Sequence, residues 1–255
     1  MTAALGRLAL VAALLAAPVV ARSQDTRTLT VFAASDLTFA FRELVPRFER
    51  AQGVRVTLVL GSTGNLARQI EHGAPADVFF AADEGFIDGL VAQGALVGAT
   101  RQTYGRGRLA LATSRQLGLK LPDLRALLRP EIRRVAIASP AHAPYGRAAE
   151  EALRRAGVWE AVRPKLVYAD NIRHALQYIQ SGAAEAGLVA LSVADVPEIA
   201  WTPVDATLHA PLDQAAAVVR GSARSELGLA FIHFVNGAEG RAVMKRYGFL
   251  VPGEF

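Results

Sequence analysis

The chain has 255 residues and no cysteine, and its 28 Lys and Arg against 23 Asp and Glu give a formal net charge of +5. Without cysteine there is no disulfide framework, no cysteine to carry a lipid anchor and no cysteine-based zinc site. The arginines are scattered singly or in pairs, such as Arg133-Arg134, and are not interleaved with aromatic residues. This pattern argues against a nucleic-acid partner and for a mild attraction of small anions.

The N-terminus predicts a secretory signal peptide over residues 1–21. Arg7 precedes an apolar stretch from Leu8 to Val20, and small residues occupy the positions that a signal peptidase inspects before Ala21. The stretch is too short and too rich in alanine for a membrane span, and the alternative is a buried N-terminal helix. We expect cleavage after Ala21 and a mature chain that lies free in the periplasm without inserting into the membrane.

Strands and helices alternate through the rest of the chain. The pattern predicts strands at 29–33, 54–60, 77–81, 109–113, 134–138, 165–168, 186–189 and 214–219, and helices near 37–52, 65–72, 86–91, 124–128, 146–156, 172–181, 226–235 and 239–247. Pro46 is expected to kink or split the first helix. Alternation of this kind predicts an α/β fold with mostly parallel sheets flanked by helices. A second series of elements begins after Gly107, which suggests two lobes with a cleft between them.

Two neighbouring junctions between a strand and a helix carry hydroxyl groups. At Gly61-Ser62-Thr63-Gly64 the glycines let the backbone approach a ligand, and the first helical turn leaves amide N–H groups without intrahelical partners. Side-chain hydroxyls beside such amides make a cradle for an anion. Ser35 and Asp36 occupy the same position after the first strand, where helix capping is the alternative interpretation. Two such junctions in succession suggest one shared oxyanion site.

Two later junctions have the same form. Tyr145 begins a helix after a loop that contains two prolines and His142, and the alternative for this loop is a rigid turn with an exposed histidine. Ile172 begins a helix after Asp170 and Asn171, either of which is a natural cap. Four helix N-termini that point into one cleft could surround a tetrahedral anion with neutral donors only.

Catalytic and metal-binding patterns are weak by comparison. Ser62 lacks the Gly-x-Ser-x-Gly spacing of a hydrolase nucleophile, no phosphate-binding Gly-Lys loop occurs, and the five histidines lack metal-ligand spacing. We therefore expect no enzyme activity, no cofactor and no direct metal ligand. The rivals from other classes are a periplasmic serine hydrolase or phosphatase acting through Ser62 or Asp36, and a signalling module that passes its ligand state to a sensor.

Taken together, these segments resemble the periplasmic molybdate-binding proteins, which are the soluble receptors of molybdate ABC importers. The likeness covers essentially the whole mature chain and is most specific at 65–79, 140–147 and 245–249. It implies a two-lobed periplasmic binding protein fold (type II) in which the chain crosses twice between the lobes. Lobe 1 is expected to comprise residues 25–106 and 212–255, and lobe 2 residues 107–211.

The resemblance also implies which residues hold the oxyanion. The first ligand hydroxyl falls at Ser35 or Asp36, and the second falls at Thr63, with Ser62 beside it. A carboxylate facing a dianion would be repelled and desolvated, so we expect Ser35 to donate while Asp36 caps the helix or points away. If the Asp36 carboxylate does face the pocket, it becomes a hydrogen-bond acceptor, and the ligand is then a protonated oxyanion.

The second lobe is expected to supply the backbone amides of Tyr145 and Ile172. A tyrosine that reaches the anion in some relatives falls at Ala190, which has no hydroxyl. The Tyr145 hydroxyl is one candidate replacement, and the alternative is a tyrosine packed at the cleft mouth with its hydroxyl in water.

The resemblance implies high-affinity periplasmic binding of molybdate, and also of tungstate, with delivery to the permease of an ABC importer. The chain is expected to act as a monomer. The alternative ligands are other tetrahedral oxyanions, namely tungstate in preference to molybdate, sulfate or phosphate.

Overall fold

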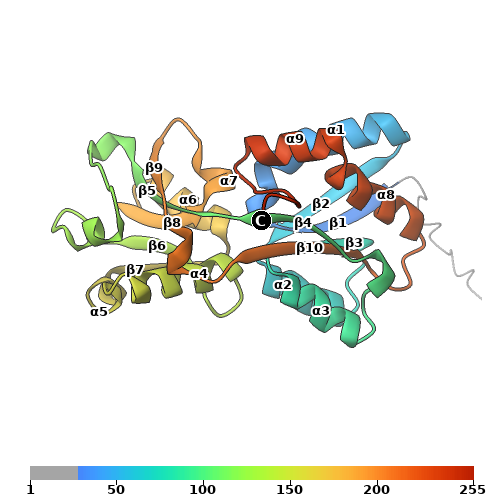
Figure 1. Ribbon diagram of the computed structural model, residues 1–255, viewed down its shortest axis with the longest axis horizontal. Helices are drawn as coiled ribbons and strands as arrows, with labels where there is room; N and C mark the ends of the chain where they lie inside the picture. The colour runs from blue at the N-terminus through green and yellow to red at the C-terminus, as the bar shows by residue number, and fades with distance from the viewer. Residues whose placement is uncertain (1–27) are drawn as a thin grey trace, which may run out of the picture.

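The computed structural model describes residues 28–255, so the predicted signal peptide lies outside the described residues. Each of two mixed sheets has five strands, and Figure 1 shows them side by side as two lobes. We call the part built on the first sheet lobe 1 and the part built on the second sheet lobe 2. The first sheet has the order β2-β1-β3-β10-β4 and the second the order β7-β6-β8-β5-β9. The strands are β1 Thr28–Ala34, β2 Arg55–Gly61, β3 Val78–Ala81, β4 Gln102–Gly107, β5 Leu109–Ser114, β6 Val135–Ala138, β7 Leu166–Ala169, β8 Ala186–Ala190, β9 Ile199–Pro203 and β10 Leu212–Val218.

Both sheets follow the same rule of strand direction. In the first sheet β1 is parallel to β2 and β3, whereas β10 is antiparallel to both of its neighbours, β3 and β4. In the second sheet β6 is parallel to β7 and β8, whereas β5 is antiparallel to both β8 and β9. Four strands of each sheet therefore share one direction, which confirms the predicted mostly parallel, two-lobed α/β fold.

Helices cover both faces of each sheet. In lobe 1, α1, α8 and α9 lie on one face while α2 and α3 lie on the other, and in lobe 2 α4 and α5 lie opposite α6 and α7 (Figure 1). The α-helices are α1 Thr38–Gln52, α2 Thr63–Glu71, α3 Glu84–Ala92, α4 Pro144–Arg155, α5 Trp159–Val162, α6 Ile172–Gln180, α7 Leu191–Ala194, α8 Ser225–Asn236 and α9 Ala238–Arg246. Short 3₁₀ turns include η1 at Ser35–Leu37 and η4 at Leu124–Leu128. None of the helices between residues 28 and 255 is long and apolar enough to cross a bilayer.

The predicted elements match the observed β-strands and α-helices apart from end positions and four omissions, and the predicted helix at 124–128 is the 3₁₀ turn η4. The omitted elements are β4, β9, α5 and α7, which are short or lack a clear hydrophobic period. Helix α1 continues through Pro46, so this residue does not split it. Pro46 has no N–H, so the carbonyl of Arg42 loses its donor within the helix. Both residues lie on the exposed face of α1, where water can donate to that carbonyl instead.

An aromatic cluster fixes α1 and α8 on the first sheet. Phe41 of α1 meets Phe80 of β3 and Phe231 of α8 edge-on, with ring centroids 5.1 and 5.4 Å apart. Phe48 meets Phe231 in the same way at 4.9 Å. Such contacts add about 0.5–1.5 kcal/mol each beyond the buried area. They hold α1 and α8 together against β3.

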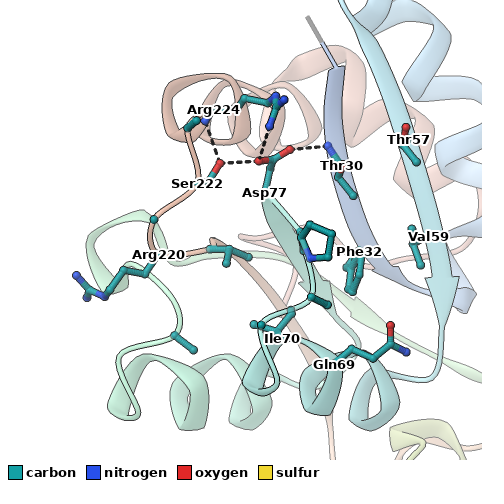
Figure 2. Close-up of a pocket in the computed structure, with 18 of the residues that line it drawn as sticks. Thr30, Phe32, Thr57, Val59, Gln69, Ile70, Asp77, Arg220, Ser222 and Arg224 are labelled. Carbon is teal, nitrogen blue, oxygen red and sulfur yellow. Dashed lines mark hydrogen bonds and ion pairs between the residues drawn. The ribbon is translucent and has the colours of Figure 1, made fainter. Parts of the chain in front are cut away.

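A buried carboxylate, that of Asp77, fixes the start of β3, at the end of the strand away from the junctions with hydroxyl groups. Asp77 accepts hydrogen bonds from the Thr30 amide and the Ser222 hydroxyl, both at 2.7 Å, and lies 3.5 Å from the Arg224 guanidinium (Figure 2). Three groups from distant segments therefore satisfy this side chain. They tie β1, β3 and the loop after β10 together.

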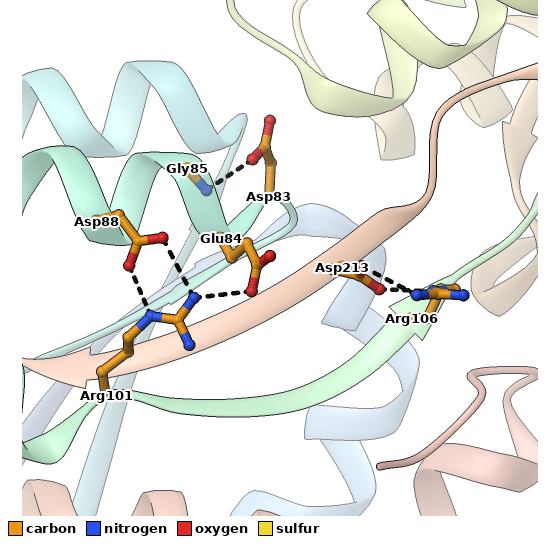
Figure 3. A network of polar contacts seen from close by, with 7 residues as sticks. All are labelled: Asp83, Glu84, Gly85, Asp88, Arg101, Arg106 and Asp213. Carbon is orange, nitrogen blue, oxygen red and sulfur yellow. Dashed lines mark hydrogen bonds and ion pairs between the residues drawn. The ribbon is translucent and has the colours of Figure 1, made fainter. Parts of the chain in front are cut away.

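The chain passes between the lobes twice, from β4 to β5 and from β9 to β10, near the centre of Figure 1. On the two crossing strands Arg106 and Asp213 form a bidentate pair, with N–O distances of 2.5 and 3.0 Å (Figure 3). This pair joins the two connections at the point about which the lobes would hinge.

Candidate functional site

A small cavity lies where the carboxyl ends of lobe 1 strands meet the N-termini of lobe 2 helices. The residues that line it are Ala34, Ser35, Asp36, Gly61, Ser62, Thr63, Ala82, Ala143, Pro144, Tyr145 and Ile172. All six candidate residues named from the sequence are therefore brought together, although they come from four separate junctions. The free volume is about 10 Å³, room for roughly one water molecule, so an anion with four oxygens enters only as the lobes move apart.

Lobe 1 presents two hydroxyl groups to this cavity. Thr63 Oγ1 accepts a hydrogen bond from the Ala82 amide at 3.0 Å, which leaves its own proton available for a ligand. The Ser35 side chain is buried, and its hydroxyl has no hydrogen-bond partner within residues 28–255. Ser62 differs, because its hydroxyl lies 2.9 Å from Nδ1 of His142 in lobe 2. Ser35 and Thr63 are thus the hydroxyls best placed to donate to an anion.

Lobe 2 presents two helix N-termini. Tyr145 and Ile172 lie in the first turns of α4 and α6, where a backbone N–H has no intrahelical acceptor. Asn171 caps α6 by accepting from the amides of Arg173 and His174, at 3.0 and 3.1 Å, and leaves the Ile172 amide for the cavity. Both helices direct the positive ends of their dipoles toward the site, which favours an anion.

Asp36 does not cap a helix, so that expectation was wrong. The N-cap of η1 is Ala34, with no side-chain capping bond. Instead, Oδ2 of Asp36 accepts from the Tyr145 hydroxyl at 3.0 Å and from Nε2 of Gln214 at 2.8 Å. Two neutral donors from distant elements hold the carboxyl inward, where it lines the cavity. Its other oxygen, Oδ1, is buried and has no partner among the described residues.

The Tyr145 hydroxyl is buried, so the expectation that it lies in water at the cleft mouth was also wrong. A tyrosine hydroxyl has one proton, and here Tyr145 donates it to Asp36 while accepting from Gln214 Nε2 at 3.1 Å. This arrangement argues against a direct bond from the hydroxyl to an anion. The packing requires Gly107, because a Cβ there would lie 2.1 Å from the Tyr145 oxygen.

Burial dominates the electrostatics of this group. It raises the pKa of Asp36 from 3.8 to about 6, although the hydrogen bonds from Gln214 and Tyr145, and after them the backbone amides of Asp36 and Leu37, act in the opposite direction. Burial, together with the nearby Asp36 carboxyl, also raises the pKa of both Tyr104 and Tyr145 well above the ordinary value. The two tyrosines are therefore neutral donors.

Sequence reasoning missed Gln214 and Tyr104. Tyr104 donates to Oε1 of Gln214 at 2.7 Å, which turns Nε2 of that amide toward Asp36. One signal for Gln214 was present, because it is an uncharged polar residue that precedes an apolar run, Ala215 to Val219. Nothing local distinguished Tyr104 from an ordinary core aromatic.

The lobes contact each other beside the cavity. The Gly64 amide donates to the His142 carbonyl at 2.9 Å, and Arg147 pairs with Asp83 at 2.5 Å. His142 is half-buried and bonded to Ser62, so it is not the exposed loop residue of the alternative interpretation. A Cβ at position 64 would lie 2.8 Å from the His142 carbonyl oxygen, which explains the glycine. Within residues 28–255 no three His, Asp or Glu side chains gather as a metal site.

Known proteins are similar to this chain in sequence and architecture over nearly its whole length. The chain is 34% identical to a molybdate-binding protein of Escherichia coli (strain K12), over 89% of this chain and 90% of the relative. It is similar to the solved structure of the Azotobacter vinelandii periplasmic molybdate-binding protein, at 30% identity and a TM-score of 0.81, covering 88% of this chain and 99% of that one. The sulfate-binding protein of Mycobacterium tuberculosis shares the fold, at 18% identity and a TM-score of 0.74 over 89% of this chain and 87% of that one. The family model described as bacterial extracellular solute-binding protein matches residues 29–250, and the chain therefore belongs to this family.

Proposed function

We propose that this protein binds molybdate between its two lobes in the periplasm and delivers it to an ABC importer. The observation that carries the proposal is the meeting of two free hydroxyls and two free helix amides at one cavity between the lobes. These groups belong to Ser35, Thr63, Tyr145 and Ile172. The names of the relatives in Escherichia coli and Azotobacter vinelandii supply the identity of the anion.

The chemistry of the site is recognition, because the chain is a solute-binding protein and not an enzyme. Hydrogen bonds from neutral donors to a charged oxygen are worth about 1.5–3 kcal/mol each. As the lobes close over the ligand, water leaves the site and these bonds strengthen. The hydrogen bond between Ser62 and His142 then acts as a contact between the lobes, next to Gly64.

Tungstate has the same charge and shape as molybdate, so we propose that it binds too. Sulfate shares the charge but is smaller, and discrimination against it would rest on the size of the closed cavity. Phosphate at neutral pH bears a proton and therefore needs an acceptor in the site. Asp36 carries the one carboxyl in the cavity lining, and its unpaired Oδ1 could accept that proton, which makes phosphate the main competing ligand.

We also propose that the protein is exported to the periplasm and acts there as a monomer. The apolar run from Leu8 to Val20 supports a signal peptide ending at Ala21 and export to the periplasm. We propose a monomer that presents the closed lobes to the importer permease. The lobe boundaries, 25–106 with 212–255 and 107–211, are part of the proposal and are supported by the distribution of strands between the two sheets.

Calorimetric titration of the purified mature protein tests the ligand directly. We expect saturable binding of molybdate and tungstate at pH 6, and a rise in Tm with each, because a ligand that binds only the folded state stabilises it. Sulfate and phosphate at equal concentration serve as controls. Binding of sulfate or phosphate as tight as that of molybdate would contradict the proposal.

A further inference from the structure

The unpaired oxygen of Asp36 leads to an inference that rests on the proposed function. We propose that Asp36 holds a proton on Oδ1 and donates it to an oxygen of bound molybdate. Binding of the dianion then takes up one proton from solution whenever free Asp36 is ionised. The site senses pH through the same side chain that contacts the ligand.

The hydrogen bonds of Asp36 decide which oxygen carries the proton. Oδ2 accepts from the Tyr145 hydroxyl and from Gln214 Nε2, so both donors point at this oxygen. Tyr104 fixes the amide of Gln214 by donating to its Oε1, which keeps Nε2 on the Asp36 side. Oδ1 has no partner among residues 28–255 and is completely buried. A proton on the carboxyl therefore belongs on Oδ1, and it then lacks an acceptor until a ligand oxygen arrives.

No cation neutralises Asp36 in the described part of the chain. The titratable groups that face it are Tyr104 of β4 and Tyr145 of α4, both uncharged, and β10 contributes the neutral Gln214. On α7 the Ser192 hydroxyl bonds the Asp36 carbonyl, at 2.8 Å.

The charged side chains on α1 and α6, the other elements packed near Asp36, have other partners or face solvent. Arg42 of α1 and Arg173 of α6 lie over the Phe39 ring, at 5.5 and 5.3 Å from its centroid. Glu43 on α1 pairs with Arg47 and Arg246, and His174 on α6 is exposed to solvent.

An ionised Asp36 and a dianion cannot share this cavity without a large penalty. Two like charges would lie together with little water between them, and each would be desolvated. A neutral carboxylic acid in an apolar site instead donates a hydrogen bond to a developing or fixed anion. One shared proton therefore converts a repulsive contact into a charge-assisted hydrogen bond. Hydrogen phosphate could reach the same arrangement by bringing its own proton to an ionised Asp36.

Burial raises the pKa of Asp36 to about 6, which agrees with this assignment. Below that pH the free protein already carries the proton. Above it, each pH unit lowers the population of the binding-competent form about tenfold. Between pH 6 and pH 8 the apparent molybdate affinity should therefore fall by roughly fiftyfold.

The test is calorimetry with molybdate from pH 5 to 8.5, in buffers of different ionisation enthalpy, on the wild type and on Asp36→Asn. The wild type should take up close to one proton per molybdate at pH 8 and almost none at pH 5. In Asp36→Asn the amide oxygen can accept from Tyr145 and Gln214 while the NH₂ group replaces the Oδ1 proton. Its molybdate affinity should be independent of pH, and it should take up no proton. Asp88→Asn removes the same charge at an exposed site and should keep the wild-type profile.

Wild-type molybdate affinity that is flat between pH 6 and 8, with no proton uptake, would overturn the inference and leave the proposed function intact. Absence of molybdate binding at pH 5 and 6 would refute the proposed function itself. The wild-type proton count decides the question even if Asp36→Asn fails to fold.

Discussion

Two buried aspartates mark two very different regions of lobe 1. Asp77 borders a hollow of about 940 Å³ at the edge of the sheet, whereas Asp36 lines a cavity of about 10 Å³ between the lobes. Both carboxylate oxygens of Asp77 are occupied, one by a backbone amide and the other by a hydroxyl and an arginine (Figure 2). Asp36 has two neutral donors on one oxygen and none on the other.

Unsatisfied polar groups distinguish the candidate site from other hollows, whereas volume does not. The large hollow contains none of the six candidate oxyanion-binding residues, and its buried carboxylate already has its partners. The small cavity concentrates groups that lack partners, and such groups are costly unless a ligand completes them. The count of hydrogen bonds therefore separates the satisfied carboxylate of Asp77 from that of Asp36, which has one oxygen left for a ligand.

The largest expected effect is on stability, at the satisfied carboxylate. Asp77→Asn removes a negative charge beside the nearly buried Arg224 and turns an NH₂ group toward one of the present donors, Thr30 N or Ser222 Oγ. Breaking such a pair should lower the free energy of unfolding by about 3 kcal/mol or more, measured by urea denaturation. Molybdate affinity should stay within about twofold of the wild type. A tenfold loss of affinity would mean that the two regions are coupled.

Asp36→Asn should have the opposite effect on stability, and only at higher pH. The pKa of Asp36 in the folded protein, about 6, lies above the value of 3.8 for an unperturbed carboxyl. Ionisation therefore destabilises the folded state as the pH rises from about 4 to 6, by up to roughly 3 kcal/mol. The variant lacks this penalty, so its Tm should exceed that of the wild type at pH 8 and match it at pH 4. An equal Tm at both pH values would show that burial does not perturb this carboxyl.

The hydroxyl variants should change binding by an intermediate amount. Thr63→Ala and Ser35→Ala each remove one donor, which should weaken molybdate binding by about 1–3 kcal/mol. Thr63→Ala should lose more, because it also deprives the Ala82 amide of its acceptor. Thr63→Ser should restore most of the affinity, and Thr57→Ala, an exposed threonine beside the large hollow, is the matched control. Full molybdate affinity in both alanine variants would show that neither hydroxyl binds the anion.

The smallest effect concerns the contact between the lobes. Arg147 pairs with Asp83 across the cleft, but both side chains are partly exposed, so the pair is worth about 1 kcal/mol at most. Arg147→Gln should speed molybdate dissociation by no more than about fivefold, with the difference shrinking at high salt. Arg101→Gln breaks a comparable pair within lobe 1, to Glu84 and Asp88, and should leave dissociation unchanged (Figure 3). Stopped-flow measurement of molybdate dissociation from the two variants separates an effect on lobe closure from a general effect of charge. Equal dissociation rates would show that the pair between Arg147 and Asp83 does not restrain opening of the lobes.

Much of the fold could be predicted from local patterns in the sequence. Apolar residues with a strand period, followed by Gly61 and two hydroxyls, predict a strand that ends at a helix start, and the structure has β2 and α2 there. Because parallel strands end at the same edge of a sheet, several such junctions predict one shared site. The six candidate residues do line one cavity, whereas their roles toward an anion stay predictions.

The orientation of Asp36 was beyond any local rule. Its neighbours in sequence favour a cap, since Asp at a helix start normally bonds to the next amides. Tyr145 and Gln214, which lie 109 and 178 residues away, provide donors in the interior instead. They reach Asp36 because β10 inserts between β3 and β4 and because lobe 2 sets the start of α4 against η1. The sequence by itself determined the strand and helix junctions and the type of groups they present, since these depend on residues a few positions apart. Only the tertiary structure decided which of those groups are satisfied and which stay free for a ligand, since hydrogen-bond partners from distant segments are fixed by packing.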